Sequence, residues 1–265
     1  TVTMSELYDT AYLNKPAIID GLLYPGTYLF VGAPKVGKSF LMAQLAYHIS
    51  TGLPLWGNEV RQGKVLYLAL EDDYARLQKR LYRMFGTESI DNLRFAVMAN
   101  TVDGGLEKQL EGFLHQYPDT RLIIIDTLQK IREVSTDGYS YANDYEIVGR
   151  LKQFADSHEI CMILVHHTRK QAADDRFDMI SGTNGLLGAA DGAFVLHREK
   201  GEVFLDFVGR DLPEQRYVLK FEPTHCLWEM VRTDVQTFEE QPEPLLDWID
   251  ALVLDFWNGT ATRLL

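Results

Sequence analysis

The sequence has few cysteines and no long apolar segment, and both absences narrow the class of protein. Two cysteines in 265 residues cannot build a disulfide framework or a CxxC-type zinc site, and free thiols are typical of a reducing compartment. The longest apolar runs, such as Leu122–Ile125 and Met162–Val165, are far shorter than the roughly 20 residues of a membrane-spanning helix. The chain begins without the basic and then apolar segments of a secretory signal. We therefore expect a cytoplasmic protein with no membrane partner.

An excess of basic charge is also missing. The chain carries 26 Lys and Arg residues against 38 Asp and Glu residues, for a formal net charge of −12. This balance argues against a protein that coats nucleic acid over its whole surface, but it leaves room for a local basic loop. Apolar and charged residues make up 46% and 24% of the chain, which is ordinary for a folded protein. The length then indicates one large domain, with or without a short appendage.

Short apolar runs alternate with amphipathic helical stretches from about residue 27 to residue 166. This rhythm predicts an α/β fold in which a mostly parallel sheet is covered by helices on both sides. The expected strands are Tyr28–Val31, Val65–Leu70, Arg94–Met98, Leu122–Ile125 and Ile160–Val165, and the expected helices span about 38–51, 73–85, 106–117 and 144–157.

After residue 190 the pattern changes to short strands separated by turns. These strands, at Ala193–His197, Val203–Val208, Arg216–Phe221 and Cys226–Val231, predict an antiparallel C-terminal extension of the sheet. We therefore expect one core domain over residues 1–235 and an acidic, proline-bearing linker over 236–244. Residues 245–265 are expected to form a helical segment that opens a truncated accessory module, of helical or winged-helix type.

The segment from Gly32 to Ser39 matches the phosphate-binding pattern G-x-x-x-x-G-K-[ST], directly after a strand and before a helix. Glycines in this position let backbone N–H groups and the helix N-terminus point at a phosphate. Lys38 adds a positive charge between the outer phosphates, and the Ser39 hydroxyl is a ligand for Mg²⁺. The bland alternative is a glycine-rich turn with an incidental lysine. The expected ATP-binding residues are Gly32, Ala33, Pro34, Lys35, Val36, Gly37, Lys38, Ser39 and Phe40.

Two acidic residues follow buried strands. Asp126 ends the run Leu122–Ile125 and should emerge at the carboxyl edge of the sheet, where ligands bind in such folds. It is the expected Walker-B acid that holds Mg²⁺ directly or through water, although an aspartate that merely caps a turn fits the same position. Glu71 follows Val65–Leu70 and is the expected catalytic base, with a surface acid or helix cap as the alternative. Asp72 and Asp73 beside it are expected to cap the next helix.

Two adjacent histidines, His166 and His167, end the run Ile160–Val165 at the same edge. They are expected to sense the terminal phosphate or the attacking water, and a structural role is the alternative. Zinc is disfavoured because adjacent strand residues project in opposite directions and no partner stands at ligand spacing.

Together these segments resemble the RecA-like P-loop ATPases of the plasmid RepA type, which are hexameric replicative helicases of plasmids, phages and integrative elements. The resemblance covers about residues 15–232. It rests on the phosphate loop, on Leu68–Asp73, on Ile125–Leu128 and on Val165–Lys170, in the order of that family. It implies an ATP- and Mg²⁺-dependent motor, forming a homo-hexameric ring, that moves along single-stranded DNA during replication of a mobile element.

The resemblance also implies an arginine finger and DNA-binding loops. Arg210 matches the finger, which would act on a neighbouring subunit; Arg198 is the second candidate, and a solvated hairpin arginine is the alternative for Arg210. The loops fall at about 129–143 and 168–185, and acidic residues in the second loop partly offset its basic ones. The candidate DNA contacts are Lys130, Arg132, Arg169, Lys170 and Arg176.

Two other functions use the same motifs. A nucleotide-dependent switch or loader would bind ATP and a protein partner without moving along DNA. A small-molecule kinase is disfavoured because the sequence shows no lid for an acceptor.

Overall fold

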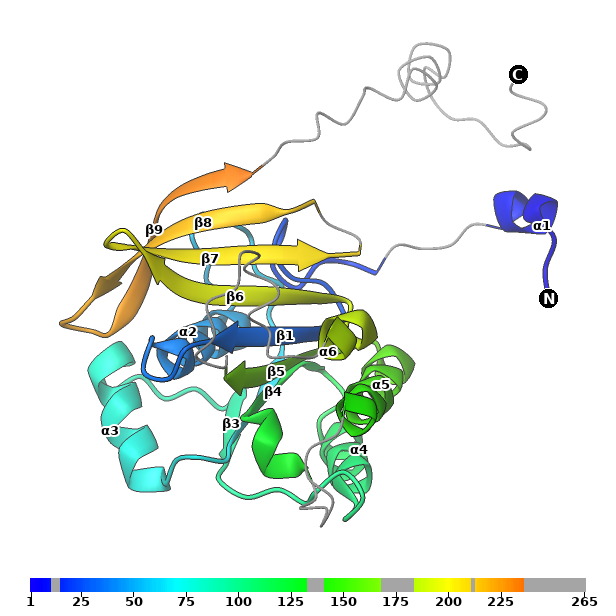
Figure 1. Ribbon diagram of the computed structural model, residues 1–265. Helices are drawn as coiled ribbons and strands as arrows, with labels where there is room; N and C mark the ends of the chain where they lie inside the picture. Colours follow the sequence, from blue (N-terminus) through cyan, green and yellow to red (C-terminus); the bar gives the residue numbers. More distant parts are fainter. Residues whose placement is uncertain (11–14, 133–140, 168–183, 211–212, 236–265) are drawn as a thin grey trace, which may run out of the picture.

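A nine-stranded sheet runs through the part of the chain that the structure, a computed structural model, describes (Figure 1). The described residues are 1–10, 15–132, 141–167, 184–210 and 213–235. The strands lie in the order β3-β2-β4-β5-β1-β6-β7-β8-β9. Their bounds are β1 Gly26–Gly32, β2 Lys64–Ala69, β3 Leu93–Ala96, β4 Thr120–Asp126, β5 Cys161–His167, β6 Gly192–Glu199, β7 Glu202–Gly209, β8 Gln215–Glu222 and β9 Leu227–Val235.

One helix, α1 Met4–Asp9, precedes the first strand, and the other helices lie between successive strands from β1 to β6. These are α2 Lys38–Thr51, α3 Tyr74–Phe85, α4 Leu106–Gln116, the 3₁₀ turn η1 Leu128–Ile131, α5 Tyr141–His158 and α6 Asn184–Ala189. None of the helices in the described ranges is both long enough and apolar enough to cross a membrane.

The predicted mostly parallel sheet with an antiparallel C-terminal extension is confirmed, with one difference in where the extension begins. The strand β6 pairs with β1 in parallel, so that Gly32 lies beside Leu196. The antiparallel part begins only with β7 and continues through β8 and β9. Because β6 enters the sheet through a parallel pairing, its carboxyl end lies at the same edge as that of β1.

Each face of the sheet buries its own core. On one face, side chains such as Tyr67 and Ile124 pack with Leu41 and Met42 of α2 and Leu77 of α3. On the other face, alternate residues such as Ile123 pack with α4 and α5 (Figure 1). Successive side chains of a strand point to opposite faces, which explains why the apolar runs are continuous rather than alternating. The expected helix layers on both sides are therefore present.

The element bounds follow the sequence closely in the parallel part. The helix expected at 38–51 is α2, and Asp73 caps α3 by accepting a hydrogen bond from the N–H of Arg76 at 2.8 Å. Asp72 does not cap the helix as expected, because it pairs with Arg80 at 2.7 Å. The short elements α1, η1 and α6 are not among the predicted ones. The predicted linker 236–244 and the segment 245–265 lie outside the described residues.

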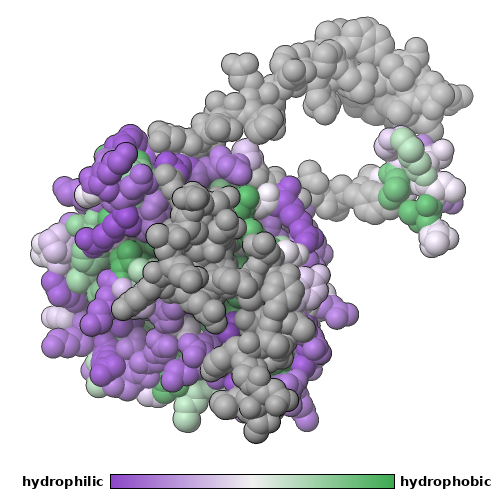
Figure 2. Space-filling view, viewed as in Figure 1, coloured by the Kyte–Doolittle hydropathy of each residue, from purple (hydrophilic) through white to green (hydrophobic). Residues whose placement is uncertain are grey.

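Where described residues reach the surface in Figure 2, they are mostly hydrophilic, with apolar residues showing in smaller patches. The exposed apolar side chains include Val2, Met4, Leu7 and Tyr8, in and just before α1. The carboxyl edge of the parallel strands carries the polar residues from which the candidate site is built.

Candidate functional site

Glycines shape the phosphate loop at its two ends. At Gly32, a Cβ atom would lie 2.6 Å from the carbonyl oxygen of Leu196 in β6, so no larger residue fits there. Gly37 adopts φ +107°, a conformation that residues with a side chain rarely take, and it forms the N-cap of α2. The loop therefore leaves β1 beside β6 and turns directly into the helix, as the phosphate-binding pattern requires.

Lys38 is buried beneath this loop, with 5% of its surface exposed. Its Nζ donates to the carbonyl oxygens of Gly32 at 2.7 Å and Ala33 at 3.0 Å. Burial lowers the pKa of Lys38 from 10.5 to about 8, because it disfavours the charged form, while the charges of Asp126 and Glu71 oppose the shift. Two backbone carbonyl groups of the loop thus hold the Lys38 ammonium in place.

Asp126 ends β4 beneath the start of α2. Its Oδ2 accepts hydrogen bonds from the Ser39 hydroxyl and from the Tyr67 hydroxyl, both at 2.8 Å. Burial raises the pKa of Asp126, and the two hydrogen bonds act in the opposite direction. A carboxylate and a serine hydroxyl side by side are hard oxygen donors, which is the chemistry that Mg²⁺ prefers. The residues present therefore fit that ion.

Glu71 and His167 complete the cluster. His167 Nδ1 lies 3.0 Å from Lys38 Nζ, and its Nε2 lies 3.8 Å from Glu71 Oε2. An ammonium only donates, so Nδ1 is the acceptor in the contact with Lys38, and the Nε2 side of the ring faces Glu71. The other Glu71 oxygen accepts a hydrogen bond from the Thr127 hydroxyl at 3.2 Å, and the Glu71 side chain is 46% exposed. A carboxylate that is both oriented and open to solvent is suited to accept a proton from water.

The alternation of side chains explains why two of these residues meet. Asp126 and His167, the last residues of β4 and β5, each lie two positions after a side chain that packs on the face of α2, namely Ile124 and Val165. Glu71 lies in the turn after β2, where its carboxylate accepts the hydrogen bond from Thr127. His166 lies two positions after Leu164, which packs on the other face of the sheet, so its side chain points away from α2. Of the two predicted sensor histidines, the structure therefore brings His167 to the phosphate loop.

The two candidate finger arginines occupy opposite edges of the sheet. Arg198 lines a pocket of about 390 Å³ together with the loop residues Gly32–Val36. Arg210 is exposed; its backbone N–H donates to the carbonyl oxygen of Asp191 at 2.9 Å and its guanidinium to that of Gly188 at 3.1 Å. Because Asp191 pairs with Thr27 at the start of β1, Arg210 lies roughly 16 Å from Gly32 along the strand direction. Within one subunit Arg210 does not reach the loop.

The candidate DNA contacts are described only in part. Lys130 in η1 is exposed, as a phosphate contact requires. Arg132 is buried, with 8% of its surface exposed. This differs from the expectation, because a DNA contact requires a side chain that reaches solvent. The reason is local: Arg132 directly follows η1, whose residues Leu128 and Ile131 are fully buried in the core beneath. Arg169, Lys170 and Arg176 lie outside the described residues.

Tyr67 and Thr127 are polar partners that sequence reasoning missed. Tyr67 lies inside the apolar run Val65–Leu70, where it is interpreted as a core residue, yet its hydroxyl reaches Asp126. Tyr67 lies two positions before Ala69 on the same strand, so both side chains point toward α2. This two-residue spacing is the signal that would have found it. Thr127 directly follows Asp126 and has no predicted role, yet its hydroxyl donates a hydrogen bond to Glu71.

Comparison with known proteins gives matches by sequence and by structure. A family model described as "AAA domain" matches residues 8–173, more than half of the chain. The DNA repair protein RadA of Synechocystis sp. is 26% identical over 175 residues, which cover 62% of this chain and 33% of RadA. The chain thus spans about a third of the length of that relative.

Two solved structures share the fold. One is an ATPase domain with a TM-score of 0.66 at 16% identity, and the match covers 78% of this chain and 85% of that one. The other is a DnaB-like replicative helicase, solved to show its interactions with primase. It has a TM-score of 0.64 at 16% identity, and its match covers 78% of this chain and 57% of that one. At this identity the likeness shows the RecA-like fold of helicase ATPase domains and not a function.

The lowered pKa of Lys38 predicts how stability depends on pH. Between about pH 8 and pH 10.5 the unfolded chain binds a proton at Lys38 that the folded chain does not, so stability rises with pH in that window. The free energy of unfolding of the wild type should gain about 1.4 kcal/mol per pH unit relative to Lys38→Met between pH 8 and pH 10. Urea unfolding at several pH values measures this difference. Lys108→Met, at an exposed position of α4, is the control, and an equal trend in both variants would contradict the assignment.

Proposed function

The chain belongs to the AAA domain family, and from this we propose that it is a Mg²⁺-dependent ATPase that drives movement along single-stranded DNA. One observation carries the proposal: Lys38, Ser39, Asp126, Glu71 and His167 converge on one phosphate loop, with the contacts given above. A loop that bound phosphate without hydrolysis would not need an exposed, oriented carboxylate beside the lysine.

In this proposal each residue has one task. The backbone N–H groups of residues 33–40 and the Lys38 ammonium bind the triphosphate, and His167 lies between Lys38 and Glu71, where it contacts the terminal phosphate. Glu71 accepts the proton of the attacking water. Asp126 and Ser39 would hold Mg²⁺, which when bound neutralises charge on the phosphate oxygens.

The proposed motor is a ring of identical subunits of the RepA-like replicative type, acting in replication of a mobile element. Three observations support this: the matching motifs, the RecA-like fold shared with a DnaB-like helicase, and the position of Arg210. An exposed arginine far from its own loop is available to a neighbouring loop, where it would stabilise the charge that develops on the transferred phosphoryl group.

Replacing the proposed base separates binding from hydrolysis. Glu71→Gln keeps the shape of the side chain but removes the proton acceptor, so kcat for ATP hydrolysis should fall about 100-fold or more while ATP binding persists. Phosphate release and equilibrium binding of a fluorescent ATP analogue measure the two quantities. Glu111→Gln, at an exposed position of α4, should hydrolyse ATP like the wild type. Turnover of Glu71→Gln close to that of the wild type would remove Glu71 from this role.

The finger is tested by mixing two inactive variants. Arg210→Ala and Glu71→Gln should each hydrolyse ATP at least about 100-fold more slowly than the wild type. A mixture should regain a substantial fraction of the activity, because some interfaces then join an intact Glu71 site to an intact Arg210. Arg76→Ala on the exposed face of α3 serves as the control and should be active alone. If Arg210→Ala is inactive and mixing restores nothing, Arg210 does not act between subunits.

Single-stranded DNA distinguishes a motor from a switch or loader. A motor should hydrolyse ATP several-fold faster when an oligonucleotide is present, and added salt should weaken the effect because phosphate contacts are ionic. Lys130→Ala should raise the oligonucleotide concentration needed for half-maximal stimulation about two- to fivefold, whereas Lys108→Ala should not. ATP hydrolysis that ignores the oligonucleotide would favour the switch or loader instead.

A further inference from the structure

The carbonyl oxygen of Gly37 receives two hydrogen bonds, one from inside its own helix and one from far along the chain. The backbone N–H of Leu41 donates to it at 3.2 Å, and the indole Nε1 of Trp228 in β9 donates at 3.2 Å. A peptide unit is planar, with its C=O and N–H pointing in opposite directions. Holding the Gly37 carbonyl therefore also sets the direction of the Lys38 N–H, one of the amides that line the loop.

The indole ring of Trp228 also packs directly on Gly37. A Cβ atom at Gly37 would lie 2.6 Å from Cζ2 of the ring. Trp228 is 1% exposed and packs edge-on against Phe221, with 4.9 Å between the ring centroids. The ring is thus confined on one side by its own hairpin and touches the loop on the other. Glycine at position 37 is required by this contact as well as by its positive φ.

The strand that carries Trp228 is itself anchored to the helices beside the site. The Gln44 side chain in α2 makes two hydrogen bonds with the Trp228 backbone: its Oε1 accepts from the N–H at 2.8 Å, and its Nε2 donates to the carbonyl at 3.0 Å. The Trp56 indole donates to that same carbonyl at 2.9 Å. Trp228 therefore has a fixed position relative to α2, whose first turn is part of the phosphate loop.

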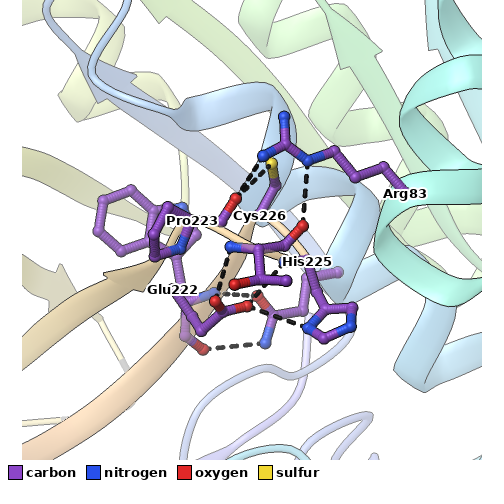
Figure 3. A network of polar contacts seen from close by, with 8 residues as sticks. Arg83, Glu222, Pro223, His225 and Cys226 are labelled. Carbon is purple, nitrogen blue, oxygen red and sulfur yellow. Dashed lines mark hydrogen bonds and ion pairs between the residues drawn. The ribbon is translucent and has the colours of Figure 1, made fainter.

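A second anchor holds the turn that joins β8 to β9. The guanidinium of Arg83, near the end of α3, donates to the carbonyl oxygens of Pro223 at 2.5 Å and Thr224 at 3.0 Å (Figure 3). Within the turn, the Glu222 carboxylate accepts from the backbone N–H groups of Thr224 and His225. The hairpin thus bridges α2, which carries Lys38, and α3, which begins just after Glu71.

We propose that Trp228 is a positioning residue of the nucleotide site, holding the Gly37–Lys38 peptide in the orientation that binds phosphate. This inference rests on the proposed function and extends the site to the C-terminal hairpin, 191 residues from Gly37 in sequence. Trp228 acts through the loop backbone and does not itself touch the phosphates. Its indole N–H is the decisive group, because the ring alone packs on Gly37 without fixing the carbonyl.

Removing that N–H while keeping an aromatic ring tests the proposal. Trp228→Phe should weaken binding of a fluorescent ATP analogue with Mg²⁺ about three- to tenfold, the effect of losing one hydrogen bond. The KM for ATP should rise by a similar factor, and kcat should stay within about twofold. The matched control is Trp56→Phe, which also loses an indole-to-carbonyl bond. That carbonyl keeps its bond from Gln44, so binding should change less than about twofold.

Hydrogen exchange of the protein without nucleotide gives an independent readout. The amides of residues 33–40 should exchange faster in Trp228→Phe than in the wild type, and at the wild-type rate in Trp56→Phe. Equal effects of both variants on affinity and on exchange would show that Trp228 only stabilises the fold and would overturn the proposal. If the wild type binds no nucleotide but exchange still responds to Trp228→Phe alone, the proposed function fails while the link between Trp228 and the loop stands.

Discussion

The candidate site depends on one geometric constraint, the alternation of side chains along strands that end at a common edge. Asp126 and His167 are the last residues of two different strands, yet both lie on the side of the sheet that faces α2, and Glu71 lies in the turn just after a third strand. Since α2 begins with the phosphate loop, every strand that keeps its register delivers its polar residue to the same place. A slip of one residue in β5 would exchange His167 for His166. The buried cores on both faces of the sheet are what prevent such slips.

The charges of the site are packed closely, and burial changes how readily they form. Lys38 lies under the loop between backbone carbonyls and His167, and Asp126 is held by two hydroxyl groups. Burial pushes the pKa of Lys38 down and that of Asp126 up, so both groups are less readily charged than in water. A bound triphosphate and its cation would reverse both shifts, which couples ligand binding to the charge state of the site.

Much of this arrangement was predictable from the sequence, for reasons that differ between elements. The parallel strands are continuous apolar runs and the loop has a specific pattern, so the sequence predicts β1, α2 and the polar residues at the carboxyl ends of β2, β4 and β5. It does not predict the parallel pairing of β6, because a short strand carries no signal of direction. The burial of Arg132 depends on how η1 packs, and Trp228 has the pattern of an ordinary core residue. Contacts between positions almost 200 residues apart leave no local pattern.

The position of Arg210 has a consequence for how copies of the chain associate. Arg210 and the phosphate loop lie at opposite edges of one sheet, so a contact that brings the arginine of one copy to the loop of the next joins two different surfaces. Such a contact is head-to-tail and not the self-complementary pairing of a two-fold dimer. After one such contact, one copy still has an unused loop and the other an unused arginine, so further copies add until a ring closes or the assembly continues as a filament. The rotation between neighbouring copies, a property of neither surface alone, would decide which of the two forms.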